Sequence, residues 1–408
     1  MLNAALLDGR SDDAPAATIS RSLTLLFAVS VGVIVTNLFA SQTLVGVIGA
    51  SLGLQEGAAG FVAMASLLGY SAGLFLLVPL ADLTENRSLV VRLLSGAVLA
   101  AACTTLVQGA GPLLASLFLL GACCSAIQVL VPVAASMAAP EHRGQVIGDV
   151  MSGLMVGILL SRPVASLLAD AVGWRGFYGG SAAAMALLTA VLARKLPRRA
   201  PAGRTSYPAL IASLWQLLRD EPVLRRRSLT ASLAMASFSL FWTSIALKLA
   251  QPPYDLGQRG VALFALVGAG GAVVTPIFGR AGDRGWTRPA TVAAHVLIVG
   301  SLLIAAWAPQ TGSATVSLAL LGLTAVLLDV GTTGDQTLGR RSINLLNPEA
   351  RGRINGLFVG LFFLGGAVGS SVAGVAWSWG GWTAVCLVGA GFGAMTLALD
   401  VLAKPVRG

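Results

Sequence analysis

Two charged residues lie inside long apolar segments, and their positions are the first indication of chemistry in this sequence. Arg162 falls in GLMVGILLSRPVASLLAD, residues 153–170, and Asp329 falls in LGLTAVLLDVGTTGDQ, residues 321–336. Either segment is long enough to be buried in lipid, where insertion scales assign about 2.5 to 3.5 kcal/mol to a charge at a helix centre. A cost of this size predicts that each residue has a compensating partner or a function.

Two interpretations of Arg162 remain open at this point. The guanidinium can extend to the outer headgroup region or pair with Asp170, two turns further along. Alternatively, it lines a water-filled cavity and meets an anionic substrate group or an acid on another helix. The position 208 residues later, which is equivalent in an internal repeat, is Ser370, so the fold does not require a cation there. This difference favours a functional role.

Asp329 is the only carboxylate placed deep within an apolar run. A carboxylate that is alternately dry and wet, or paired and unpaired, binds and releases protons, which is what proton coupling requires. The alternative is a structural role, either a fixed pair with a basic group or a cap near Thr332 and Thr333. Asp149 is a second candidate for proton coupling, although it lies one turn into its helix and can reach cytoplasmic water.

The segments that must position these residues are helices. Of the 408 residues, 56% are hydrophobic and 11% are charged, whereas soluble domains have roughly 25% charged residues. A spanning helix needs about 20 apolar residues, and such runs cover residues 23–46, 58–80, 89–108, 113–138, 146–169, 176–193, 228–249, 260–279, 289–308, 314–334, 354–377 and 382–403. A β-barrel would alternate apolar and polar residues, and these runs are apolar on every side. The sequence therefore predicts an all-α membrane protein with 12 transmembrane helices.

Basic residues indicate the orientation of these helices. If the N-terminus is cytoplasmic, all but four of the 27 Lys and Arg residues fall in cytoplasmic segments, the four being Arg162, Arg175, Lys248 and Arg259. The positive-inside rule then predicts that both termini are cytoplasmic, and it accounts for the net charge of +10 without a nucleic-acid partner. The first apolar run is too long for a cleaved signal, so we expect it to stay in the membrane.

An internal repeat predicts two pseudo-symmetric six-helix bundles. The segment QVLVPVAASMAAPEHRGQVIG, beginning at Gln128, aligns at a constant shift of 208 residues with QTLGRRSINLLNPEARGRING, beginning at Gln336. The Gly-Trp pairs at Gly173 and Gly381 keep the same shift. The predicted parts are a cytoplasmic tail, residues 1–22, a bundle, 23–193, a cytoplasmic linker, 194–227, a second bundle, 228–403, and a tail, 404–408.

The linker has helical spacing in its middle, around Trp215. This part is either a helix on the membrane surface or a tether on the soluble side.

Two parallel six-helix repeats are typical of alternating access, in which the halves rock about a central site near the bilayer midplane.

Motifs for catalysis, cofactors and metals are missing from the sequence, so we do not expect an enzyme, a cofactor or a metal. His142 and His295 have no partner at the spacing of metal ligands. The cysteines, Cys103, Cys123, Cys124 and Cys386, fall in apolar runs, where packing as small hydrophobes is favoured over a disulfide or a metal site.

A loop motif carries a specific resemblance. The segment GRAGDRGWTR, from Gly279 to Arg288, resembles the motif of the major facilitator superfamily, in which an aspartate follows a glycine by four residues and basic residues come next. The equivalent first-half segment, VPLADLTENR, retains Asp82 and Arg87. Helix count, loop positions and the repeat extend the resemblance over the whole chain. It implies the two-bundle fold of that superfamily.

Within the superfamily, PEHRGQVIGDVMSGLMVGILLSRP and FLGGAVGSSVAGVAW resemble the bacterial efflux-permease branch near the drug:proton antiporters. Two motifs depart from the antiporter pattern, one in helix 4 and one in helix 5. Gly121 and Ser125 stand where those antiporters carry an arginine and a glycine in helix 4, and Arg162-Pro163 stands in place of Gly-Pro in helix 5. The resemblance therefore implies export without implying polyspecific drug export.

Helices 1, 4, 7 and 10 line the substrate cavity in the superfamily. The resemblance thus implies cavity roles for several polar or aromatic residues besides Arg162, which are Asn37, Gln42, Gln128, Trp242, Thr243 and Gln336. It also implies a gating set at the cytoplasmic helix ends, namely Asp82, Arg87, Asp283, Arg284, Arg143 and Arg351. The two aspartates can face a positive helix N-terminus and nearby arginines when the cytoplasmic side is closed. The alternative is that these are solvated loop charges.

Together these features predict a secondary transporter of a bacterial inner membrane that exports a small organic compound in exchange for protons. The expected partners are a small-molecule substrate, protons and the lipid bilayer, and we expect a monomer. A proton-driven importer of a metabolite is the first alternative. A non-transporting receptor or sensor built on the same fold is the second.

Overall fold

The computed structural model describes residues 19–198, 206–347 and 350–402, and every regular element in these ranges is helical. Most of the predicted N-terminal tail and the whole of the predicted C-terminal tail, residues 404–408, lie outside the described residues. The all-α class expected from the apolar runs is confirmed.

Six α-helices and two short 3₁₀ segments make up the N-terminal half. They are α1 (Arg21–Leu52), α2 (Glu56–Leu76), η1 (Val78–Asp82), α3 (Asn86–Leu106), α4 (Ala110–Cys124), α5 (Ala126–Ser136), η2 (Pro140–His142) and α6 (Arg143–Lys195). The next helix, α7 (Tyr207–Asp220), lies in the linker. The C-terminal half contains α8 (Pro222–Leu249), α9 (Gln258–Ala269), η3 (Gly270–Val274), α10 (Thr275–Asp283), α11 (Thr287–Trp307), η4 (Ala308–Thr311), α12 (Ala314–Asn344) and α13 (Arg351–Leu402).

Twelve spans follow from these helices. Among the described residues, nine helical segments are long and apolar enough to cross a membrane. The two longest, of 56 and 52 residues, each contain two spans that meet at a kink, and α9, η3 and α10 together form the remaining span. The kinks lie at Gly173, with φ 75°, and at Gly381, with φ 59°, a region that glycine adopts readily. The repeat therefore preserves the turn between the last two spans of each half.

One predicted span is not a continuous helix. The run at residues 260–279 is divided between α9, η3 and α10. Three glycines, Gly268, Gly270 and Gly271, lie at the change from α-helix to 3₁₀-helix, and glycine is a poor helix former. Pro276 follows within the first turn of α10, where a proline is tolerated.

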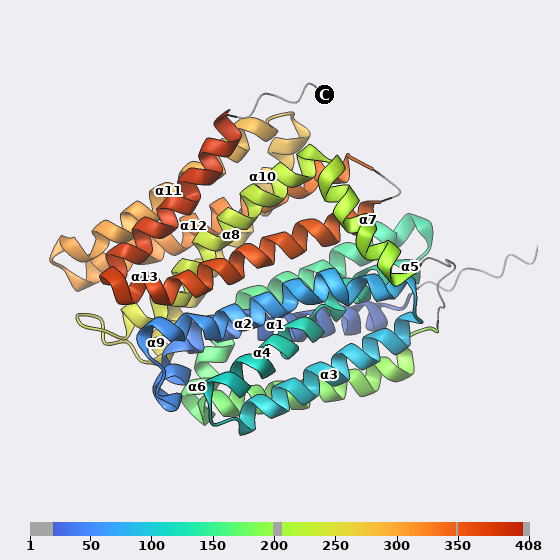
Figure 1. Cartoon of the computed structure of the whole chain (residues 1–408), viewed down its shortest axis with the longest axis horizontal. Helices are drawn as coiled ribbons and strands as arrows, with labels where there is room; N and C mark the ends of the chain where they lie inside the picture. Colours follow the sequence, from blue (N-terminus) through green and yellow to red (C-terminus); the bar gives the residue numbers. More distant parts are fainter. Residues whose placement is uncertain (1–18, 199–205, 348–349, 403–408) are drawn as a thin grey trace, which may run out of the picture.

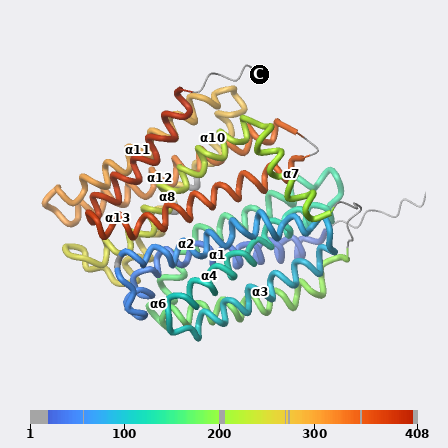
Figure 2. The backbone as a smooth tube through the Cα atoms, in the orientation of Figure 1, coloured from blue at the N-terminus to red at the C-terminus, as the bar shows by residue number. Residues whose placement is uncertain are grey.

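The two halves lie side by side, and α7 lies at one end of the molecule (Figure 1). Figure 2 shows the two segments of α13 on either side of its kink. The first segment lies against α2 of the other half, and the second turns back beside α11. The halves also meet where α1 packs on α8 and where α6 packs on α9.

Glycines allow α2 and α13 to approach closely at the end opposite α7. A Cβ atom on Gly60 would lie 2.3 Å from the Ser370 carbonyl oxygen, and one on Gly374 would lie 2.3 Å from the Gly57 carbonyl oxygen. Near the same end, Asp170 of α6 pairs with Arg259 of α9 at 2.6 Å. This end of the interface is closed, and Asp170 pairs across it with Arg259 rather than with Arg162.

The linker helix α7 contacts both halves. The Tyr207 hydroxyl donates to the Leu76 carbonyl oxygen at 2.9 Å, and Arg353 Nη1 of α13 donates to Ser213 Oγ at 2.9 Å. Leu210 and Leu214 are buried, whereas Trp215 is exposed. The amphipathic spacing in the linker therefore corresponds to a helix packed across the end of the two bundles.

Candidate functional site

Arg162 is buried between the two halves. Its Nε and Nη2 atoms donate to Gln42 Oε1 of α1 at 3.1 and 3.0 Å, and the residue is 5% exposed. Within the described part of the chain, no carboxylate oxygen lies within 4 Å of its guanidinium. The guanidinium therefore has a neutral hydrogen-bond partner and no ion pair.

Three aromatic rings surround this guanidinium. Its Cζ atom lies 5.1 Å from the ring centroid of Phe39, 5.0 Å from that of Phe238 and 4.3 Å from that of Trp242. Phe39 comes from α1, whereas Phe238 and Trp242 come from α8 in the other half. Contacts of a cation with ring faces offset part of the cost of burial. Sequence reasoning missed both phenylalanines, although Phe39 precedes Gln42 by three residues and Phe238 precedes Trp242 by four, which places each pair on one helix face.

The indole of Trp242 connects Arg162 to the buried carboxylate. Trp242 Nε1 donates to Asp329 Oδ1 of α12 at 3.0 Å, and Asp329 is 8% exposed. Arg162 belongs to α6 and Asp329 to α12. In the structure both residues contact one side chain, without an ion pair shorter than 4 Å between them. We call these three residues, Arg162, Trp242 and Asp329, the central site.

Glycines next to the central site let the backbone of the broken span come close. A Cβ atom on Gly268 would lie 2.5 Å from Trp242 Cζ2, and one on Gly271 would lie 2.5 Å from Asp329 Cβ. The interruption between α9 and η3 therefore lies directly against Trp242 and Asp329. Discontinuous helices at the bilayer midplane are a common feature of transporter binding sites.

Two more predicted cavity residues lie near the central site. Gln42 Nε2 donates to Ser239 Oγ of α8 at 3.5 Å, so Gln42 contacts both halves. Thr243 of α8 shares a hydrogen bond of 3.1 Å with Ser370 of α13. Ser370 is the repeat equivalent of Arg162, so the equivalent positions of the two halves make different polar contacts.

The other predicted cavity residues lie away from the central site, and one of them, Gln128, lines a cavity nearer the α7 end. Asn37 accepts a hydrogen bond from Ser181 Oγ at 2.8 Å and packs inside the N-terminal half, away from the expected cavity. Gln128 donates to the Tyr70 hydroxyl at 3.2 Å, and Gln336 is half-buried on α12. Asp149 is exposed and lines a surface cavity beside α1 rather than the space between the halves.

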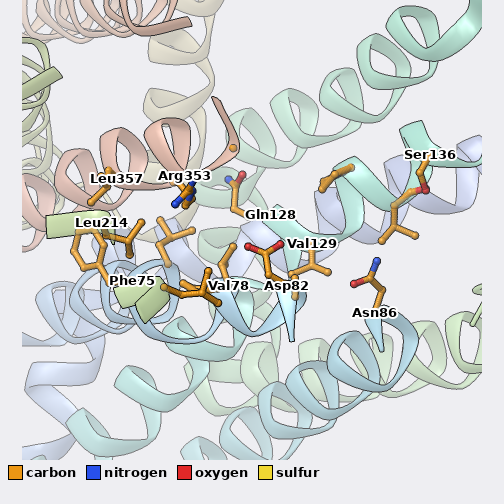
Figure 3. Close-up of a pocket in the computed structure, with 18 residues that line it drawn as sticks. Phe75, Val78, Asp82, Asn86, Gln128, Val129, Ser136, Leu214, Arg353 and Leu357 are labelled. Carbon is orange, nitrogen blue, oxygen red and sulfur yellow. The ribbon is translucent and has the colours of Figure 1, made fainter. Parts of the chain in front are cut away.

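A cavity of about 580 Å³ opens at the α7 end of the molecule. Figure 3 shows Asp82, Asn86, Gln128 and Arg353 around this space, together with apolar side chains from both halves and Leu214 of α7. The distribution of basic residues predicts that this end is cytoplasmic. The interface is thus hollow on the predicted cytoplasmic side and closed on the other.

Among the described residues, no ion pair of the gating set joins the two halves. Asp283 pairs with Arg341 of α12 within its own half, and Arg143 Nε donates to the Ala138 carbonyl oxygen at 3.4 Å. Asp82 is exposed at the cavity, Arg87 is half-buried, and Arg284 and Arg351 are exposed. The expected latch contacts belong to a conformation closed on this side, and the cavity here is open.

His295 has two partners that the sequence spacing did not indicate. Its Nε2 atom lies 2.9 Å from Asp335 Oδ1, and its Nδ1 atom lies 3.6 Å from Asp400 Oδ2. The partners come from α12 and α13, so no local motif connects the three residues. The carboxylates at both ends of the imidazole were missed for that reason.

Comparison with known proteins shows similarity over most of the chain. The family model described as Major Facilitator Superfamily matches residues 25–334. The uncharacterized transporter YgaY of Escherichia coli O157:H7 is 35% identical over 372 residues, which cover 91% of this chain and 93% of that protein.

Solved structures share the fold at low sequence identity. The crystal structure of the nucleoside transporter NupG aligns with a TM-score of 0.73 at 14% identity and covers 93% of this chain and 98% of that chain. A bacterial homologue of the human lysosomal transporter Spinster, in an inward-facing and occupied conformation, aligns with a TM-score of 0.71 at 13% identity and covers 93% and 96%.

Proposed function

The chain belongs to the major facilitator superfamily and is a multi-pass membrane transporter of that type, and from this premise we propose that it exports a small organic compound in exchange for protons. Transport proceeds by alternating access, in which the two six-helix halves rock about the central site. The bacterial inner membrane is the proposed location, with both termini in the cytoplasm, and one chain supplies both halves as a monomer.

The observation that supports this proposal best is the composition of the central site. Arg162 comes from the N-terminal half, whereas Trp242 and Asp329 come from the C-terminal half. Rocking of the halves changes the contact between Arg162 and Trp242, and with it the surroundings of Asp329. A ligand or proton that alters the charge of Asp329 therefore binds the two conformations with different affinity, which is the requirement for coupling.

Asp329 is the proposed proton carrier. In the conformation described here it is buried and accepts a hydrogen bond from Trp242. A substrate group that donates a hydrogen bond to this carboxylate competes with a proton for the same oxygen atoms. The carboxylate therefore binds either the substrate or a proton, and the two cross the membrane in opposite directions. Arg162, which makes no ion pair with any residue that the structure describes, is proposed to hold or sense an anionic group of the substrate.

Charge balance favours a second candidate, proton-coupled uptake. Arg162 and an ionised Asp329 cancel each other, and both are buried. An anion bound to Arg162 would leave the carboxylate uncompensated unless it takes up a proton, since an unpaired buried charge is costly. Anion and proton would then cross together, and the inward proton gradient would drive uptake.

The test uses inside-out vesicles without an imposed gradient and a panel of organic anions, cations and neutral metabolites. Export by exchange makes the vesicle lumen more alkaline when a substrate is added, because protons leave as the compound enters. Cotransport makes the lumen more acidic. Asp329→Asn is expected to abolish the pH change in either case.

Asp149→Asn is the matched control, because Asp149 is exposed at a surface cavity, and it is expected to keep wild-type coupling. Coupling that survives in Asp329→Asn would overturn the assignment of the proton carrier. Labelled compounds that cross without any pH change would indicate a uniporter. No flux for any compound, together with tight binding of one of them, would favour a sensor.

A further inference from the structure

A second group of charged residues is buried in the C-terminal half, outside the central site. His295 of α11 is 0% exposed, and its two ring nitrogens face Asp335 of α12, 1% exposed, and Asp400 of α13, 6% exposed. Asp400 Oδ2 also accepts from Arg227 Nη1 of α8 at 3.0 Å. We call these four residues the His295 cluster. It joins α8, α11, α12 and α13.

The charges of this cluster do not balance without a proton. Arg227 compensates one of the two carboxylates, and the second carboxylate remains. Arg226 Nε lies 3.8 Å from Asp400 Oδ1, but 27% of its side chain is exposed, so water screens its contribution. A buried charge without a partner is costly. One bound proton makes the four residues neutral.

The geometry indicates that the imidazole holds this proton. Each ring nitrogen faces a different carboxylate, Nε2 at 2.9 Å from Asp335 and Nδ1 at 3.6 Å from Asp400. A neutral imidazole has one N–H, so its other nitrogen would direct a lone pair at a carboxylate oxygen. An imidazolium directs an N–H to both. At 3.6 Å the Asp400 contact is an ionic one, and His295 Nδ1 has no hydrogen-bond partner within the described residues.

We propose that His295 is a second proton-binding site of this protein, which holds a proton as an imidazolium between Asp335 and Asp400 and so keeps α8, α11, α12 and α13 packed together. The site is separate from Asp329, and it does not depend on the direction of transport. Arg227 lies near the start of α8 and Asp400 near the end of α13, so the cluster faces the predicted cytoplasmic end.

The charged groups that surround His295 come from three of the helices that pack on α11, namely α8, α12 and α13. They are Arg226 and Arg227 of α8, Asp335 of α12 and Asp400 of α13, and Arg288 of α11 interacts electrostatically with Arg226. The charged residues of α10, which also packs on α11, make no ion pair with His295 in the described part of the chain.

A metal ion is the alternative ligand for the same side chains. His295, Asp335 and Asp400 each offer a ligand atom, and these atoms lie within 4.8 Å of one another. The two ring nitrogens, however, face different carboxylates, and Asp400 already accepts from Arg227. A divalent cation would also leave an excess of positive charge in a buried place, whereas a proton leaves none.

The protonation of His295 can be measured directly, because the chain has two histidines and the other, His142, is exposed. In His142→Gln protein labelled with ¹⁵N-histidine, His295 gives the only imidazole signals. We expect nitrogen shifts of an imidazolium at neutral pH. Shifts of a neutral ring would overturn the proposal.

A stability series tests the charge balance. His295→Gln removes the cation, so the melting temperature at pH 8 is expected to fall by about 5 °C. Adding Asp335→Asn removes the uncompensated carboxylate and is expected to restore most of this loss, whereas His142→Gln alone changes nothing. A double variant no more stable than His295→Gln would contradict the proposal. So would a melting temperature of the wild type that rises with zinc and falls with a chelator.

Discussion

Trp242 connects two buried charged residues, Arg162 and Asp329, because it contacts both. One face of its ring lies 4.3 Å from the Arg162 guanidinium, and its Nε1 atom donates to Asp329. The ring contact and the hydrogen bond use different parts of the indole. Substitutions can therefore remove one contact and keep the other.

We predict that Trp242→Phe uncouples transport from protons while it preserves much of the substrate binding. The phenyl ring keeps an aromatic face toward Arg162, but the donor to Asp329 is lost. Hydrogen bonds to charged groups are worth about 1.5 to 3 kcal/mol, so we expect substrate-driven proton movement to fall about tenfold or more. The pH change in inside-out vesicles measures this effect.

Phe238→Leu is the matched control for the ring contacts. Phe238 faces Arg162, and its ring offers Asp329 no hydrogen-bond donor. This variant should weaken substrate binding and leave the number of protons moved per substrate unchanged. A Trp242→Phe protein that couples as well as the wild type would show that the hydrogen bond to Asp329 is not needed.

At the scale of helices, close crossings decide which conformation the halves adopt. A Cβ atom added to Gly374 would lie 2.3 Å from the Gly57 carbonyl oxygen, and one added to Gly60 would lie 2.3 Å from the Ser370 carbonyl oxygen. Small residues let helix backbones approach in membranes, where van der Waals contact supplies much of the association. The α2–α13 crossing therefore depends on the absence of side chains.

We predict that Gly374→Val opens this crossing and slows transport. The added side chain must push α2 away, and overpacking of this kind costs about 1 to 3 kcal/mol. The conformation closed at the end opposite α7 loses that stability, so exchange in vesicles should slow about tenfold or more.

Gly391→Val is the control on the same helix, because nothing lies within 4 Å of a Cβ atom at Gly391. Its transport rate should stay within about twofold of the wild type, since surface substitutions usually change stability by less than about 0.5 kcal/mol. Equal rates for the two valine variants would show that the crossing does not limit exchange.

For the whole molecule, the two ends of the interface differ. One end is closed by the α2–α13 crossing and by the Asp170–Arg259 pair, and the other end contains the cavity between the halves and α7. The pair is mostly exposed on the Arg259 side, so it contributes little stability by itself. Backbone contact between the helices is the stronger restraint.

We predict that a disulfide across this end stops transport reversibly. A Cβ atom on Gly57 would lie 3.7 Å from the Ser378 Cβ atom, which suits a disulfide. Oxidised Gly57→Cys/Ser378→Cys protein is locked closed at this end, so substrate exchange should be lost and should return on reduction. The single cysteine variants are the controls. Exchange that continues in the fully cross-linked protein would contradict rocking of the halves.

The helices, their number and the repeat can be predicted from the amino-acid sequence, because these features depend on local composition. Apolar runs of spanning length must be helical in lipid, where backbone groups have no other partners. The Gly-Trp pairs illustrate this: Gly173 and Gly381 have the same spacing in each half, and both adopt positive φ at a kink. The apolar runs do not indicate how each helix is rotated about its own axis.

Which polar residues contact one another could not be predicted from the sequence and is seen in the folded chain. Arg162 contacts Gln42 from 120 residues away, Asp329 contacts Trp242 from 87 residues away, and His295 contacts Asp335 from 40 residues away. Asn37 is as polar as Gln42 and lies on the same helix, yet it packs inside its own half. These contacts depend on how each helix is rotated about its axis and on how closely two helices approach where glycines let them cross. Both are set by packing between segments far apart in the chain.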